Sequence, residues 1–461
     1  MDLKISSCTG FALPVLLLSV ALAACGDKTT TTNAAPTAVT LARYNATGAP
    51  GTPGTPDTGF GTQGVVMTDV NASQDDIAFA VVLQPDGKII AVGSSFTAPA
   101  SIMVIRYNAN GTLDSTFGSN GITVTSLPSV DASAFAATLD SSGKLLVAGR
   151  SSASSGATGF LLLRYHTNSN LITGTPGTLD AGFGTGGIVT TGIPSGVLNG
   201  ANAVVLSGTN ILVAGHSKIG GKFVIALAQY TSSGVLDTTT GFGGGTGIVT
   251  TQIGAGDADV AALAVQPLDG KIVAAGLAGN AVTNVWDVAL LRYNTDGTLD
   301  LPFGGTNTGM VITDIGSSSN YANAVALQAD GKIVVAGNAF ANPSANTSDI
   351  AVLRYNADGS LDTAGFGSPN GYVTTSVGAF DNGYAVAVQP SDGKIVVAGN
   401  ADAGVGDRLA LLRYNADGGL DSGFGTGGIV TRAASGPSII AGAFGVALQP
   451  SDGAIVVVGY D

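Results

Sequence analysis

The sequence contains no glutamate: all 31 of its acidic residues are Asp. Glu favours helices, whereas Asp hydrogen-bonds to nearby backbone groups and favours turns. The 461-residue chain is also rich in Gly, with 69 copies, and dense in Val, Ile and Thr, which favour strands. This composition predicts an all-β protein.

Histidine, cysteine and basic residues are also scarce. The chain has two His, two Cys and 18 Lys and Arg, and its net charge is −13. So acidic a chain cannot neutralise phosphates, which argues against a nucleic-acid partner. The two histidines, His166 and His216, fall in different parts of the chain, and we expect a strand-end or loop position for each rather than a catalytic role. No metal-ligand spacing and no phosphate-binding loop is present, so we expect neither a metal nor a cofactor.

The N-terminal segment 1–24 reads as an export signal. Lys4 precedes an apolar run, 11–23, that is too short to span a bilayer. The run ends in L-A-A-C, which resembles the lipobox of bacterial lipoproteins. The resemblance implies cleavage before Cys25 and lipidation of its thiol, and hence a bacterial cell-envelope protein that meets the membrane only through its anchor. The alternative is an ordinary signal peptide cleaved at a nearby Ala, which would give a secreted protein.

Residues 25–40 have no hydrophobic period, which predicts a flexible tether. The folded domain is expected at 41–461. With Cys8 lost and Cys25 lipidated, it would contain no disulfide and would depend on burial between repeats.

The rest of the chain repeats one sequence pattern seven times. In the copy at 324–375 it reads A-V-A-L-Q-A-D-G-K-I-V-V-A-G, a variable loop, A-V-L-R-Y-N-A-D-G-S-L-D, and then F-G followed by G-Y-V-T-T. Successive copies lie roughly 60 residues apart, a spacing in the range of propeller repeats. Each copy predicts four strands, named A to D in chain order, and in this copy they are expected at 324–328, 332–337, 351–356 and 371–375. Apolar residues run consecutively in strand B, which indicates a sheet covered on both faces.

These features predict a seven-bladed β-propeller with four antiparallel strands in each blade. The repeats begin at Leu41 with strand C and end at Asp461 after strands A and B. We therefore expect the two terminal half-blades to pair and close the ring, since an open solenoid would need capping repeats.

The motifs D-G-K-I-V-V-A-G, L-R-Y-N-x-D-G-x-L-D and F-G-x-x-G resemble the bacterial delta-60 repeat, a predicted propeller repeat of exported proteins. The resemblance covers 41–461 and implies the fold, but no agreed activity. The sequence departs from the repeat at Gln229, at 207–210 (S-G-T-N) and at Ala454.

An Arg in strand C recurs with the Asp of the following L-D motif. We expect the two to form a bidentate ion pair that ties strand C to the C–D loop, as in Arg106 with Asp114, Arg164 with Asp180, Arg292 with Asp300, Arg354 with Asp362, and Arg413 with Asp421. Gln229 cannot pair by charge with Asp237. The N-x-D-G-x-L-D segment resembles part of a calcium loop, but an Arg occupies the first ligand position, so an Asx turn is the preferred interpretation.

The loops fall into two classes. Because strands alternate in direction, the A–B and C–D loops share one face, here called the turn face. The B–C and D–A loops differ between copies and share the other, the variable face, where function usually lies. The candidate ligand-binding residues on the variable face are Asp75, Asp131, Phe135, Asp257, Trp286, Asp381, Tyr384 and Phe444. Alternatively, the aromatic residues fill gaps between blades, and Trp286 is an interface anchor only if it is exposed.

The sequence favours a non-enzymatic, monomeric scaffold that binds a protein, peptide or glycan through its variable face. The alternative is a propeller hydrolase or lyase that uses Asp residues at the channel mouth. Two facing carboxylates with raised pKa values would favour the enzyme.

Overall fold

A computed structural model of the chain describes residues 37–461 apart from 48–50, 129, 154–155, 157, 169–173, 284, 317, 343–346, 403–405 and 434–440. The segment predicted to be an export signal, Cys25 and most of the expected tether lie outside the described residues. No helix in the described part of the chain is long and apolar enough to cross a membrane.

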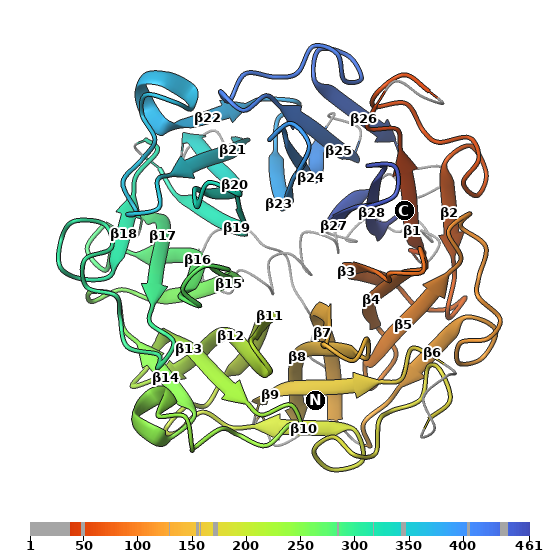
Figure 1. Ribbon diagram of the computed structural model, residues 1–461, viewed down its shortest axis with the longest axis horizontal. Helices are drawn as coiled ribbons and strands as arrows, with labels where there is room; N and C mark the ends of the chain where they lie inside the picture. The colour runs from red at the N-terminus through yellow and green to blue at the C-terminus, as the bar shows by residue number, and fades with distance from the viewer. Residues whose placement is uncertain are drawn as a thin grey trace, which may run out of the picture.

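The described residues form seven four-stranded antiparallel sheets arranged as a ring (Figure 1). Helix is confined to a 3-10 turn, η1 (Phe242–Gly245), and a π turn, η2 (Gly367–Gly371), within these residues. The prediction of an all-β, seven-bladed propeller is therefore confirmed. In every blade strand A lies nearest the ring axis and strand D lies at the rim (Figure 1).

Each blade is built from its strands A, B, C and D in that order. Blade 1 is β27 (Gly442–Leu448), β28 (Ile455–Tyr460), β1 (Val39–Tyr44) and β2 (Val65–Thr68). Blade 2 is β3 (Asp76–Leu83), β4 (Ile89–Ser95), β5 (Ser101–Tyr107) and β6 (Ile122–Thr125). Blade 3 is β7 (Val130–Leu139), β8 (Leu145–Ala153), β9 (Thr158–Tyr165) and β10 (Ile188–Thr191). Blade 4 is β11 (Asn199–Ser207), β12 (Asn210–Ile219), β13 (Lys222–Tyr230) and β14 (Ile248–Thr251). Blade 5 is β15 (Ala258–Val265), β16 (Ile272–Gly279), β17 (Trp286–Tyr293) and β18 (Met310–Thr313). Blade 6 is β19 (Asn320–Leu327), β20 (Ile333–Asn342), β21 (Thr347–Tyr355) and β22 (Tyr372–Thr375). Blade 7 is β23 (Asp381–Val388), β24 (Ile395–Asp402), β25 (Asp407–Tyr414) and β26 (Ile429–Ala433).

The ring closes through blade 1, as expected. Strand β1 pairs antiparallel with β28 along its whole length, from Val39 opposite Tyr460 to Tyr44 opposite Ile455. Beyond the strands, Ala38 and Asp461 exchange two backbone hydrogen bonds of 3.0 and 3.1 Å. Strand β1 thus begins two residues before the expected boundary at Leu41.

The core lies between blades, which explains the consecutive apolar residues of the B strands. All residues of β4 and β5 are buried. One buried cluster joins Val92 and Val104 of blade 2 to Leu145 and Leu161 of blade 3, and similar clusters fill the other interfaces. Blade-to-blade burial therefore replaces the central core of an ordinary domain.

A tyrosine hydroxyl crosses six of the seven blade interfaces. The Tyr at the end of strand C hydrogen-bonds to the Thr at the fourth position of strand D in the preceding blade. The pairs, at 2.7 to 2.9 Å, are Tyr107–Thr68, Tyr165–Thr125, Tyr230–Thr191, Tyr293–Thr251, Tyr355–Thr313 and Tyr414–Thr375. Between blades 7 and 1 the Thr position holds Arg432, and the buried hydroxyl of Tyr44 has no hydrogen-bond partner.

Candidate functional site

Each strand A contains a β-bulge at the same place, and the bulged residue lies at the axis on the variable-face half of the strand. A bulge redirects a side chain without changing the rest of the sheet. The seven bulged residues, in order from blade 2 to blade 1, are Phe79, Phe135, Asn202, Ala261, Asn323, Tyr384 and Phe444. Three of them, Phe135, Tyr384 and Phe444, were predicted from sequence as ligand-binding residues.

The four aromatic bulge residues sit on four consecutive blades and touch one another. Ring centroids are 5.5 Å apart for Phe79 and Phe135, 5.2 Å for Phe79 and Phe444, and 4.8 Å for Tyr384 and Phe444. Tyr460 stacks on Phe444 at 5.5 Å. Phe79 and Phe444 are buried, whereas Phe135 and Tyr384 are half-buried. We call the four the aromatic arc.

The other three bulge positions, Asn202, Ala261 and Asn323, carry small or polar residues. The amide of Asn202 donates to Asp259 Oδ1 and to the Val260 carbonyl of the next blade at 3.0 and 2.8 Å. The imidazole Nδ1 of His216 lies 3.1 Å from Asp259 Oδ2, and both side chains are buried. Sequence reasoning missed this cluster, although aligning the repeats at the bulge would have revealed Asn202 in place of an aromatic residue.

Three of the predicted acids bind backbone amides of the preceding blade. Asp75 accepts from Thr37, Asp131 from Ala100 and Asp257 from Phe223, each at 2.8 Å. In all three pairs the amide lies at the start of strand C and the acid just before, or at the start of, strand A of the next blade. Each of these acids therefore has an inter-blade contact that sequence reasoning did not anticipate.

Asp381 is fully buried, and both of its oxygens accept backbone N–H groups, from Val377 and Gly378, at 2.6 to 2.9 Å. Burial raises its pKa against those hydrogen bonds, and Asp402 is one of the neighbouring acids that raise it further. Burial also raises the pKa of Asp407, with Asp402 and Asp381 contributing, while the Asn400 amide donates to it at 3.0 Å.

Trp286 is 6 % exposed and packs over Gly279, where a Cβ atom would come within 2.8 Å of the ring. Its indole therefore serves packing and is not an exposed anchor.

On the turn face, the predicted Arg–Asp pairs are present in five blades. The Arg Nε lies 2.6 to 2.9 Å from the Asp carboxylate in Arg106–Asp114, Arg164–Asp180, Arg292–Asp300, Arg354–Asp362 and Arg413–Asp421. The Lys of the preceding D-G-K or S-G-K turn reaches the same carboxylate, for example Lys332 to Asp362 at 2.9 Å.

Each guanidinium also connects two blades. Nη1 of Arg354 donates to the Ala416 carbonyl of blade 7 at 2.5 Å, and the guanidinium lies 4.9 Å from the centre of the Phe366 ring. The other four arginines repeat both contacts. The prediction of a structural role for these pairs is confirmed, and the inter-blade contact is an addition to it. The expected bidentate geometry is not found in Arg164, Arg354 and Arg413, because Nε and Nη2 both lie against the same carboxylate oxygen, Oδ2.

Blade 4 has a neutral version of this arrangement. Gln229 and Asn210 occupy the Arg and Lys positions and donate to Asp237 at 3.2 and 2.9 Å. The hydroxyls of Thr239 and Thr240 add bonds of 2.8 and 2.9 Å. Burial would raise the pKa of Asp237, but the backbone and side-chain donors hold it well below the ordinary value.

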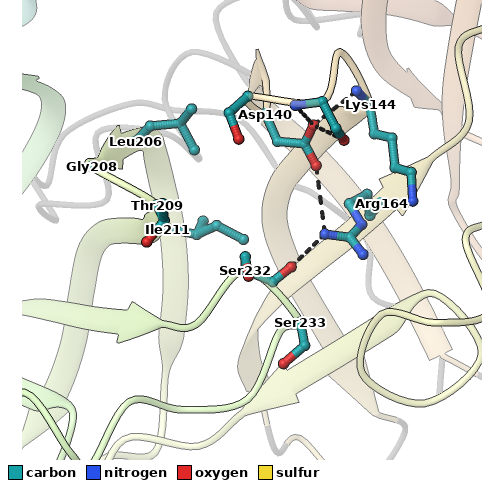
Figure 2. Close-up of a pocket in the computed structure, with 11 residues that line it drawn as sticks. Asp140, Lys144, Arg164, Leu206, Gly208, Thr209, Ile211, Ser232 and Ser233 are labelled. Atoms are coloured by element: carbon teal, nitrogen blue, oxygen red, sulfur yellow. Dashed lines mark hydrogen bonds and ion pairs between the residues drawn. The ribbon is translucent and has the colours of Figure 1, made fainter.

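Of the cavities among the described residues, we consider two that open on the turn face, and sequence reasoning anticipated neither. One, of about 360 Å³, lies between blades 3 and 4 and includes Asp140, Arg164, Leu206, Thr209 and Ser232 in its lining (Figure 2). The other, of about 560 Å³, lies between blades 6 and 7 and includes Asp330, Arg354, Gln389 and Asp417. Among the described residues, no three His, Cys or Asp side chains are grouped so as to hold a metal ion.

The fold and the repeating contacts define a β-propeller repeat protein. Six segments match the family model described as "Domain of unknown function (DUF5122) beta-propeller", one in each of blades 2 to 7, at residues 84–117, 141–171, 210–239, 268–303, 328–364 and 391–424. No curated protein matches the chain.

Solved structures are similar to the chain at low sequence identity. Sqt1 from Chaetomium thermophilum is 13 % identical with a TM-score of 0.42, over 83 % of this chain and 94 % of that one. The same protein bound to the N-terminus of ribosomal protein L10 is 14 % identical with a TM-score of 0.40, over 83 % and 94 %. A putative oxidoreductase (glucose dehydrogenase) from Thermus thermophilus is 14 % identical with a TM-score of 0.39, over 83 % and 96 %.

Proposed function

We propose that the protein is an exported, lipid-anchored propeller that acts as a non-enzymatic binding scaffold. Its partner, a protein, peptide or glycan, would sit on the variable face around the axis. The observation that carries this proposal is the ring of bulged residues, which has the same backbone in all seven blades but different side chains.

The ring argues for binding because the fold does not dictate which residues occupy it. Phe, Tyr, Asn and Ala are all compatible with the same bulge. The aromatic bulge residues are nevertheless confined to four adjacent blades, so one side of the ring is aromatic and the other carries small or polar side chains. Half-buried aromatic side chains such as Phe135 and Tyr384 are typical anchors for a partner.

Exposed apolar residues extend the surface outward from the axis. Val197, in a D–A loop, is 61 % exposed, and Val282, in a B–C loop, is 93 % exposed. The loops themselves differ between blades, since the B–C turn is 220–221 in blade 4 but 280–285 in blade 5. Such loops can specify a partner without affecting the sheets.

The test replaces aromatic arc residues by a residue that the same bulge already accepts. Phe135→Asn and Tyr384→Asn copy the bulges of blades 4 and 6, and Ala261→Asn is the matched control outside the arc. Proteins captured from the native cell envelope by the full-length chain would be compared among these variants. The proposal expects loss of capture with the two arc variants and retention with Ala261→Asn. Equal capture by all variants at matched melting temperature would refute it.

Export and anchoring are tested through Cys25. Cells expressing the wild-type chain should label it with radioactive palmitate, and Cys25→Ala should abolish the label. An unlabelled wild-type chain that is found in the medium would instead indicate an ordinary signal peptide.

The alternative, a hydrolase or lyase, is favoured by one observation, the raised pKa values of Asp381 and Asp407. Of the two, Asp381 is fully engaged by backbone amides, so an acid–base role would fall to Asp407. A hydrolytic activity on polysaccharide or peptide substrates that disappears in Asp407→Asn would establish the alternative.

A further inference from the structure

The cavity between blades 3 and 4 is where three separate segments depart from the repeat. In the blade 3 A–B turn, Asp140 replaces the usual Gln and Ser142 replaces the usual Asp. In the blade 4 C–D loop, Ser233 stands where blades 6 and 7 have Asp358 and Asp417. The A–B turn of blade 4 is the third departure.

That turn is only Gly208–Thr209, whereas the corresponding turn of blade 7 spans 389–394. Gly208 has a φ of 62°, which favours Gly and allows so short a turn. The side chains of Leu206 and Ile211, on either side of the turn, line the cavity. In Figure 2 they lie across the space from Asp140 and Arg164.

The charges in this cavity are already satisfied. Arg164 donates to Asp180, Asp140 and the Ser232 carbonyl, and Lys144 Nζ lies 2.7 Å from Asp180. An anionic ligand would therefore find no unpaired cation. A cationic ligand would meet Arg164 and Lys144 beside Asp140. A neutral polar ligand avoids both conflicts.

The remaining groups suit several hydroxyls on a small carbon skeleton. Asp140 Oδ1 accepts three bonds, from Ser142 N, Ser142 Oγ and Lys144 N, at 2.6 to 2.9 Å. Its Oδ2 has only a long 3.5 Å contact with Arg164 and can accept more strongly. The lining adds hydroxyls that can both donate and accept, those of Ser141, Ser142, Thr209, Ser232 and Ser233. Leu206 and Ile211 offer an aliphatic surface for C–H groups.

The equivalent space between blades 6 and 7 shares the Arg, the Lys and an aliphatic residue, Val388 at the position of Leu206, but differs in its acids and in its A–B turn. It is lined by the acids Asp330 and Asp417 and by Gln328 and Gln389, and the long turn of blade 7 forms its wall. The blade 3–4 cavity therefore has Asp140, Ser142 and Ser233 where the blade 6–7 cavity has Gln328, Asp330 and Asp417.

We infer that the blade 3–4 cavity is a binding site for a neutral carbohydrate, such as a hexose or a terminal sugar unit of a glycan. Its volume of about 360 Å³ lies within the range of roughly 300–1,000 Å³ common for small-ligand sites. The site lies on the turn face, opposite the partner surface proposed above, and does not depend on that proposal.

The test uses a double variant whose template exists elsewhere in the molecule. Asp140→Gln with Ser142→Asp gives the turn Q-S-D-G-K, which matches the Q-P-D-G-K turn of blade 2 and should fold equally well. Binding to the full-length chain would be measured by saturation-transfer NMR and calorimetry with glucose, galactose, mannose, N-acetylglucosamine and their common disaccharides. At least one sugar should bind to the wild type, and its affinity should fall about tenfold or more in the double variant. The reason is that the carboxylate at position 140, whose Oδ2 can accept, is replaced by a neutral amide, while the carboxylate introduced at position 142 takes the exposed turn position of Asp86.

Two further variants fix the location. Thr209→Lys, at an exposed turn, should block the cavity without altering the fold, whereas Asp330→Ser, in the blade 6–7 cavity, should leave sugar affinity unchanged. Tyr384→Asn should also leave it unchanged, which separates this site from the axial surface. The inference is overturned if the wild type binds none of the sugars, or if binding persists in both the double variant and Thr209→Lys.

Discussion

The buried hydroxyl of Tyr44 allows the blade-interface contacts to be tested quantitatively. Six interfaces have a Tyr–Thr hydrogen bond, and the seventh has Arg432 in the Thr position. Tyr44 is 1 % exposed and its hydroxyl is unpartnered. Burial raises its pKa to about 12, so the hydroxyl stays protonated at neutral pH and can donate.

Arg432→Thr should create the missing bond, and Arg432→Val is the control, since Val has the shape of Thr without its hydroxyl. A satisfied buried hydroxyl is worth about 1–3 kcal/mol relative to an unsatisfied one. Both variants lose the ion pair of Arg432 with Asp461, which is 3.7 Å long and contributes about 0–1 kcal/mol. The Thr variant should therefore be more stable than the Val variant by about 1–3 kcal/mol, and equal to or more stable than the wild type.

The assay is equilibrium unfolding in urea, because about 1 kcal/mol shifts the melting temperature of so large a domain by only about 1 °C. Equal urea midpoints for the Thr and Val variants would refute the account of this interface. A Thr variant less stable than the wild type would show instead that the Arg432–Asp461 contact matters more than the missing hydrogen bond.

Three further predictions concern the acids and arginines. Asp381→Asn should lower the free energy of unfolding by about 1–3 kcal/mol, because one carboxylate oxygen that accepts backbone N–H groups is replaced by a donor. Asp131→Asn, at an exposed position, should change the free energy of unfolding by less than about 0.5 kcal/mol, and the urea midpoints of the two variants test the difference. Arg354→Leu should cost about 3–5 kcal/mol because it leaves Asp362 buried with Lys332 as its one cationic partner and the Gly365 amide as a neutral donor. Gln229→Leu should cost less because Asp237 keeps its threonine donors, so comparable losses would argue against an ionic contribution. Finally, burial would raise the pKa of Asp180, but Lys144, the Gly182 amide and Arg164 lower it to about 2. Because this folded-state pKa lies below the unfolded one, the contribution of Asp180 to stability should be complete above about pH 4 and should be lost as the pH falls toward 2. Asp180→Asn should therefore make the urea midpoint less dependent on pH over that window.

The repeat made the fold predictable because every local signal recurs seven times. The Asp-Gly turns, the consecutive apolar residues of strand B and the terminal half-blades all indicated the same ring, which β1 and β28 then close. The Arg–Asp pairs were also predictable, since both members recur at a fixed position within one copy. The expected strand boundary at Leu41 differed by two residues because the pairing with β28 extends to Val39.

The site was less predictable because its contacts join different copies of the repeat. Asp131 and Asp257 were selected as acids on variable loops, but their partners are amides of the preceding blade, which no single copy reveals. A triple replacement of Asp131, Asp257 and Asp381 by Asn would affect stability chiefly through Asp381, whose two oxygens accept backbone N–H groups, and it cannot serve as a clean test of binding. The blade 3–4 cavity likewise depends on segments from two blades.

The most direct test of the central claim, that the partner binds to the variable face, is photo-crosslinking at sites matched for exposure. A benzophenone amino acid would replace Val282 or Val197 on the variable face, and Leu268 or Val235, which are 95 % and 60 % exposed, on the turn face. After illumination in the native cell envelope, adducts of the full-length chain would be resolved by mass. The account predicts a discrete adduct from Val282 or Val197 and none from the turn-face sites. A discrete adduct from Leu268 or Val235 alone would contradict it.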